Sequence, residues 1–123
     1  MELNELTRSV LGAAFQVHTV LGPGLLESVY AAALVYELRK RGMLVTTEVN
    51  IPVLYDGVDL GLSFRADLIV ESRVILELKS VQALSPIHSK QLLNYLKLTG
   101  LPVGLLLNFN TISLRDQIVR IAN

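Results

Sequence analysis

The stretch Phe64-Arg-Ala-Asp-Leu-Ile-Val-Glu-Ser-Arg-Val-Ile-Leu-Glu-Leu-Lys79 carries apolar residues with a period of two on both sides of a short turn. This alternation predicts two antiparallel strands joined by the loop 71–73, with Val70 opposite Val74. The apolar residues of both strands are then expected to share one face of a sheet. They are Phe64, Ala66, Leu68 and Val70 before the loop and Val74, Leu76 and Leu78 after it.

The same register predicts charged pairs on the opposite face, with Asp67 opposite Glu77 and Arg65 opposite Lys79. Two carboxylates placed directly opposite each other repel, which destabilises a sheet. A divalent cation between them would turn this repulsion into ligation, and Lys79 would then lie beside the metal and a substrate phosphate. The alternative is a solvated outer face on which these charges pair with one another. The residues alone leave both interpretations open.

The composition is that of a single domain spanning residues 1–123. The chain is 51% hydrophobic, which is enough for one sizeable core, and its mean hydropathy of +0.48 is compatible with burial of further surface in a homo-oligomer. The absence of cysteine excludes disulfides, cysteine zinc sites and thiol nucleophiles. We expect a cytoplasmic protein, because no signal peptide or membrane-spanning apolar run is present. A formal net charge of zero argues against a globally basic nucleic-acid binder.

Two helices are predicted before the strands. Apolar residues at helical spacing indicate the first helix up to Leu21, and Pro23 is suited to the first position of a second helix that ends at Gly42. Glu27 of this second helix lies on an apolar face, where it is either a favourable charge near a helix N-terminus or a carboxylate directed at a metal. His18 is either a packed histidine or a ligand.

A further hairpin is predicted upstream of Phe64. The strand 45–55 leads to Asp56-Gly57, a strong signal for a two-residue turn that pairs Tyr55 with Val58. Pro52 places this strand at an edge of the sheet. Beyond the turn the apolar parity is expected to continue the core face through Val58, Leu60, Leu62, Phe64 and Ala66.

The C-terminal part predicts a helix and a buried strand. Ser85 and Pro86 are a helix N-cap and first residue, and the helix that runs to Thr99 carries His88, Gln91 and Tyr95 along one face. The apolar run 101–109 predicts a buried strand that is parallel to the strand before this helix. Residues 112–121 add a short strand or turn. The predicted fold class is α/β, an α+β mixed sheet in the order α-α-β-β-β-α-β with flanking helices.

The spacing of Asp67, Glu77 and Lys79 on a hairpin followed by a helix and a strand resembles the PD-(D/E)XK nuclease superfamily and its restriction-endonuclease-like core. The segment Gly24-Leu-Leu-Glu27-Ser-Val-Tyr30 is similar to the Gly-x-x-Glu-x-x-Tyr signature of the small bacterial GxxExxY family, and this resemblance extends over nearly the whole chain. One departure is Ala66, which stands where the nominal motif has proline.

The resemblance implies a Mg²⁺- or Mn²⁺-dependent nuclease that acts on DNA. Asp67, Glu77 and Glu27 would be the metal ligands, and Lys79 would be the catalytic lysine. The resemblance also implies lesser roles for a backbone carbonyl, a histidine and a Gln-x-x-x-Tyr helix motif that orders the site; these residues are Leu78, His18, Gln91 and Tyr95. The second hypothesis is a non-catalytic interaction or scaffold protein that keeps the nuclease fold, with a homo-oligomer as one form of it.

Overall fold

The computed structural model describes all 123 residues as three helices and a five-stranded mixed sheet. The strands follow the order β1-β2-β3-β4-β5 across the sheet, and β3 and β4 form the one parallel pair. The predicted fold class is confirmed, and the tail contributes both a 3₁₀ turn and a fifth strand. The elements are α1 (Leu3–Leu21), α2 (Glu27–Lys40), β1 (Val45–Tyr55), β2 (Val58–Val70), β3 (Val74–Lys79), α3 (Pro86–Thr99), β4 (Val103–Asn108), η1 (Leu114–Gln117) and β5 (Ile118–Ala122).

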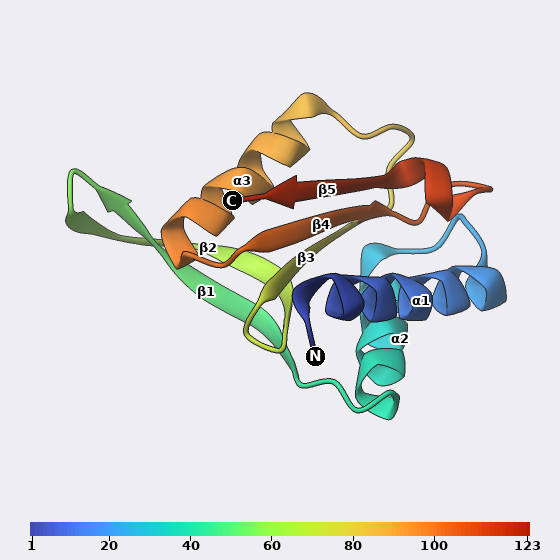
Figure 1. Cartoon of the computed structure of the whole chain (residues 1–123). Coiled ribbons are helices and arrows are strands. Elements are labelled where there is room, and N and C mark those ends of the chain that lie inside the picture. Colours follow the sequence, from blue (N-terminus) through green and yellow to red (C-terminus); the bar gives the residue numbers. More distant parts are fainter.

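The sheet separates the helices into two layers (Figure 1). Helices α1 and α2 pack on one face over a core of 20 buried residues, and α3 packs on the other over a smaller core of eight. Strand β1 lies at an edge of the sheet, as Pro52 predicted. None of the three helices combines the length and the apolar content needed to cross a membrane.

Helix α2 begins later than predicted, at Glu27 instead of Pro23. The reason is the backbone before it, since Gly22 has φ 68° and Gly24 has φ 94°, which are left-handed conformations that a helix cannot include. The hydroxyl of Tyr30, one turn into α2, donates to the carbonyl of Gly22 at 2.6 Å. This contact fixes the loop and therefore fixes where the first turn of α2 lies.

The predicted cap of α3 is confirmed. The Ser85 hydroxyl accepts a hydrogen bond from the backbone N–H of Ile87 at 3.3 Å, and Nδ1 of His88 accepts one from the N–H of Ser85 at 3.1 Å. These two bonds satisfy orphan donors of the first turn. The helix ends at Gly100, whose φ of 73° is the left-handed conformation typical of this position.

Both predicted turns are present, but the register between them shifts. Val70 lies opposite Val74, and Tyr55 lies opposite Val58. Between the β1 pairs formed by Pro52 and Leu54, residues 60–62 of β2 stand opposite a single residue of β1. This region is a bulge, in which extra residues of one strand find no partner and the ribbon twists locally.

The prediction that Ala66, Leu68 and Val70 share one face is wrong. Ala66 lies in the core under α3, whereas Leu68 and Val70 lie in the core under α1 and α2. The change of face occurs at Asp67, which, together with its neighbour Leu68, lines one pocket. On β1 the residue across from this point is Glu48, whose left-handed φ of 51° interrupts the pleat.

The outer part of β2 also departs from the prediction. Val58, Leu60 and Leu62 were expected in the core, but their exposed fractions are 58%, 48% and 68%. The β1–β2 hairpin extends past the helices in Figure 1, so no layer covers these side chains. The alternation correctly identified a strand, and the core assignment of its outer half was wrong.

Candidate functional site

Two carboxylates lie side by side where β2 and β3 separate. The backbone ladder between these strands ends at Leu68 and Leu76. Just beyond it, the N–H of Asp67 donates to Oε1 of Glu77 at 3.1 Å, and the N–H of Leu78 donates to Oδ2 of Asp67 at 2.8 Å. The side chains therefore replace the backbone pairing that the sequence predicted for Asp67 and Glu77, and each strand holds the carboxylate of the other.

The predicted pairing of Arg65 with Lys79 is not formed, because the two strands have already separated at this level. Arg65 lies opposite Asn50 of β1, and Lys79 lies opposite Asn108 of β4. Lys79 nevertheless acts on Glu77, since its positive charge lowers the pKa of this acid and partly offsets the effects that raise it. Lys79 thus contributes a cation at the site even though it lacks the predicted partner.

Glu77 is a buried acid with a strongly perturbed pKa. Its exposed fraction is 6%, and burial is the main cause that raises its pKa from 4.5 to about 8. The negative charge of Asp67 raises it further. Two carboxyl groups at this separation cannot both be ionised without a large cost, so one proton or an external cation is needed at neutral pH.

Helix α3 brings an aromatic residue to this acid pair. Tyr95 is buried, and the pKa of its phenol is raised by burial and by the charges of Glu77 and Asp67. Its ring also lies 5.2 Å from that of Phe64, which anchors α3 over β2. Gln91, one turn earlier on α3, is exposed. The predicted helix motif thus places its tyrosine near the carboxylates and its glutamine at the surface.

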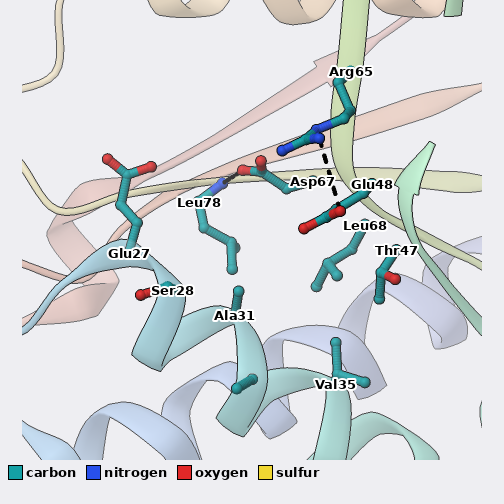
Figure 2. A pocket seen from close by; sticks show the side chains of 11 residues that line it. Glu27, Ser28, Ala31, Val35, Thr47, Glu48, Arg65, Asp67, Leu68 and Leu78 are labelled. Atoms are coloured by element: carbon teal, nitrogen blue, oxygen red, sulfur yellow. Dashed lines mark hydrogen bonds and ion pairs between the residues drawn. The ribbon is translucent and has the colours of Figure 1, made fainter. Parts of the chain in front are cut away.

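A cavity of about 520 Å³ opens between α2 and strands β1 and β2. Figure 2 shows Glu27 at one side of this pocket, in the first turn of α2, and Asp67 near its middle. On the far side Nη1 of Arg65 lies 3.8 Å from Oε2 of Glu48. Glu27 and Asp67 therefore face one pocket, and Glu77 is not part of its lining.

His18 lies in the last turn of α1 and is buried. Its Nε2 is 2.7 Å from the carbonyl oxygen of Thr111, and its ring centroid is 6.3 Å from that of Phe109. These contacts attach the loop after β4 to α1. If Nε2–H donates to Thr111, the lone pair of the neutral imidazole is on Nδ1, so metal binding by His18 would use Nδ1 and keep this contact. This role stays a prediction.

The donor chemistry of the site suits a small hard cation. Asp67 and Glu77 supply carboxylate oxygens, and Mg²⁺ is typically held by one or two carboxylates that water and substrate phosphates complete. No three histidine or acidic side chains lie close enough together to hold an ion by themselves. Glu27 is exposed across the pocket, so the structure brings together two of the three predicted acids and places the third nearby.

Two residues near the site were not singled out from the sequence. Asn108 ends β4 fully buried, and its side chain bonds both the N–H and the carbonyl of Val81, which orders the chain just after Lys79. A polar residue at the end of a run of leucines is a signal that could have found it. Glu48 offered no such signal, because its position in the pocket depends on a local backbone conformation.

Comparison with known families agrees with this geometry. A family model described as PD-(D/E)XK nuclease superfamily matches residues 4–121, which include the β2–β3 hairpin, α3 and the first turn of α2. No curated protein and no solved structure matches the chain. The matched region contains the acid pair and the lysine that follows it. The chain belongs to the PD-(D/E)XK nuclease superfamily.

Proposed function

We propose that this protein is a Mg²⁺- or Mn²⁺-dependent nuclease that hydrolyses phosphodiester bonds in DNA. Membership of a nuclease superfamily supports the reaction class. The observation that carries the proposal is the pair of hydrogen bonds between β2 and β3, in which the N–H of Asp67 donates to Glu77 and the N–H of Leu78 donates to Asp67. These bonds hold two carboxylates next to each other, and the charge of Lys79 acts on Glu77. Such a pair is costly for stability alone, and perturbed acids of this kind cluster at functional sites.

We also propose that the chain belongs to the GxxExxY family. Gly24, Glu27 and Tyr30 have distinct structural tasks that explain the spacing of this signature. Gly24 adopts the left-handed loop conformation, Glu27 is the first residue of α2, and the Tyr30 hydroxyl ties the loop down through Gly22. The signature thus encodes the placement of one carboxylate at the rim of the pocket that Asp67 lines.

In the proposed site Asp67 and Glu77 would hold the cation, and the backbone carbonyl of Leu78 and the carboxylate of Glu27 would be further oxygen donors. A divalent cation supplies positive charge that stabilises the charge developing on a phosphodiester and lowers the pKa of nearby water. Binding requires Glu77 to lose its proton. The N–H groups of Asp67 and Leu78 hold the two carboxylates in place for this role.

Lys79 orients the attacking water and contacts the phosphate through its ammonium group. Tyr95 keeps α3 in position over the Glu77 side of the site, and a role of the exposed Gln91 in ordering the site stays a prediction. Arg65 lines the pocket beside Asp67 with an exposed guanidinium, so it is placed to bind a neighbouring phosphate of the DNA strand. The ion pair of Arg65 with Glu48 is exposed and weak, and a phosphate can replace it.

The first test is binding of Mn²⁺ and Mg²⁺ to the parent protein and to Asp67→Asn by calorimetry, because it needs no choice of DNA substrate. We expect the parent to bind and the variant to lose at least tenfold in affinity, since one of two carboxylates is removed. Asp116→Asn, which alters an exposed acid on η1, is the matched control and should bind like the parent.

Cleavage of labelled single- and double-stranded DNA in millimolar Mn²⁺ completes this test. Asp67→Asn should be inactive, and Asp116→Asn should cut at the parent rate. Asp67→Asn that cuts as fast as the parent would contradict the site. A parent that neither binds Mn²⁺ nor cuts DNA would contradict the nuclease itself.

The second candidate function is a non-catalytic scaffold with a nuclease fold. The observation that favours it is the apolar, uncovered outer half of the β1–β2 hairpin, which chemistry at Asp67 does not require. The acid cluster itself forms no salt bridge that would mark it as purely structural. The metal and cleavage measurements above distinguish the two functions.

A further inference from the structure

The tip of the β1–β2 hairpin, residues 53–62, is here called the arm. It exposes large apolar side chains within a short stretch: Leu54 at 50%, Tyr55 at 73%, Val58 at 58%, Leu60 at 48% and Leu62 at 68%. Contiguous apolar surface of this kind marks interaction sites on soluble proteins. A two-stranded ribbon is also only marginally stable in water without a covering layer. No other part of the chain therefore covers the apolar side chains of the arm.

Most of this apolar surface lies on one face of the arm. Tyr55 pairs with Val58, and the bulge between them and the pair of Ile51 with Phe64 adds two residues to β2, an even number. The alternation therefore keeps Tyr55 and Val58 on the side of Ile51 and Phe64 at the root of the hairpin. Ile51 and Phe64 belong to the core under α3. The face is thus a continuation of that core beyond the end of α3, where Figure 1 shows the hairpin alone.

The charges near the arm exclude DNA as its partner. Between Val49 and Phe64 the only charged residues are Asp56 and Asp59, so the arm is acidic and has no cation for a phosphate. Helix α3, on the same side of the sheet, has the opposite character, with Lys90 and Lys97 exposed and no acidic residue. One molecule therefore carries both an acidic apolar arm and a basic helix on one side.

We propose that the arm binds a second copy of this chain. Two arms pack antiparallel through their apolar faces about a twofold axis, and the acidic tip of each lies against α3 of the other. The contact is isologous, so each copy covers the surface that the other leaves open. The apolar side chains of the arm expose on the order of 500 Å² per copy. Together with the contacts to α3, the area buried by two copies reaches the low end of specific interfaces, about 1,200 Å².

This proposal does not depend on nuclease activity, and its test is the oligomeric state of the full chain. Sedimentation velocity at about 1–100 μM, the range of dissociation constants of a moderate interface, should give a dimer for the parent. The arm variant Tyr55→Ser/Leu62→Ser should sediment as a monomer. The matched control is Val20→Ser/Tyr36→Ser, which removes side chains exposed to a similar degree, 69% and 66%, on α1 and α2. This control should remain a dimer.

A fluorescence measurement localises the interface, because the chain contains no tryptophan. Emission of the single tryptophan in Tyr55→Trp should shift to shorter wavelength as the concentration rises through the dimerisation range. The same probe in Tyr36→Trp should not shift. A parent that stays monomeric at 100 μM, roughly the weakest dissociation constant expected for such an interface, overturns the proposal. The partner of the arm would then be a different protein. An arm variant that stays dimeric, or a shift in Tyr36→Trp alone, overturns it as well.

Discussion

The two halves of strand β2 resemble each other in sequence and differ in environment. In the inner half, residues 66–70, the apolar side chains are buried on both faces of the sheet, under α1 and α2 or under α3. In the outer half, residues 58–64, side chains of the same kind are mostly exposed. Alternation identifies a strand in both halves, whereas burial depends on helices encoded elsewhere in the chain.

This difference also separates two tasks. The inner half carries Asp67 at the point where β2 leaves β3, beside the buried Glu77 of β3, whose pKa is raised by burial and by the charge of Asp67. The outer half has no titratable group apart from Asp59, and its apolar face is suited to recognition of another molecule. Substitutions in the inner half should therefore affect chemistry and stability, and those in the outer half should affect association.

The largest expected effect is that of Lys79→Ala on DNA cleavage. Loss of one positioned group that stabilises transition-state charge typically costs about 10²–10³-fold in rate, and we expect at least this loss here. Because Lys79 is only partly buried, the melting temperature should stay near that of the parent. Lys40→Ala removes an exposed cation at the end of α2 and should cut at the parent rate. Equal rates for Lys79→Ala and the parent would exclude the proposed role.

The comparison of the two halves is tested most directly by a pair of leucine substitutions. Leu76→Ala, at a fully buried position opposite Leu68 of the inner half, should lower the free energy of unfolding by about 2–5 kcal/mol. Leu62→Ala in the outer half should change it by less than about 0.5 kcal/mol when the protein is dilute enough to be monomeric. Urea unfolding measures both free energies. The protein is kept at submicromolar concentration, roughly below the dissociation constant of a moderate interface, so that it is monomeric. Similar losses for the two variants would mean that the arm is part of the folded core.

Most local signals in the sequence were reliable, and the exception is Pro23, since α2 begins only at Glu27. The cap at Ser85, the end of α1 before Gly22, the turn at Asp56-Gly57 and the loop 71–73 each depend on residues within one or two turns of chain, and each is present as predicted. The proximity of Asp67 and Glu77 was also predicted correctly, because the register of a short hairpin brings them together even though the backbone ladder ends before them.

Features that depend on distant parts of the chain were not predicted. The change of face at Asp67 arises with a left-handed Glu48 on another strand, and no pattern within β2 reveals it. The burial of Glu77 and its raised pKa depend on the packing of the surrounding fold. The sequence of the β2–β3 hairpin does not reveal this packing. The exposed arm was assigned to the core because its alternation continues that of the inner half without a break.

The raised pKa of Glu77 predicts how stability depends on pH. Between pH 4.5 and about 8 the unfolded chain has lost the proton of Glu77 while the folded chain keeps it. Unfolding then releases a proton, so the free energy of unfolding should fall as pH rises, by at most about 1.4 kcal/mol per pH unit. The contribution of the proton on Glu77 to the free energy of unfolding is therefore complete below pH 4.5 and lost above about pH 8. Urea unfolding in EDTA across this range measures it.

Substitution isolates the contribution of Glu77 to this slope. Glu77→Gln has no proton to release, so its free energy of unfolding should be less dependent on pH than that of the parent. Glu48→Gln changes an acid with a 68% exposed side chain on β1 and should keep the parent slope. An unchanged slope in Glu77→Gln would show that other groups control the pH dependence.

The smallest effect is expected for the ion pair at the rim of the pocket, where the two halves of β2 meet. Arg65 and Glu48 lie 3.8 Å apart with side chains 64% and 68% exposed, so solvent screens their attraction. Arg65→Gln should therefore change the free energy of unfolding by less than about 0.5 kcal/mol. If Arg65 binds a DNA phosphate as proposed, the same variant should weaken DNA binding and reduce its dependence on salt. A large loss of stability with unchanged DNA binding would instead make Arg65 a structural residue of the inner half.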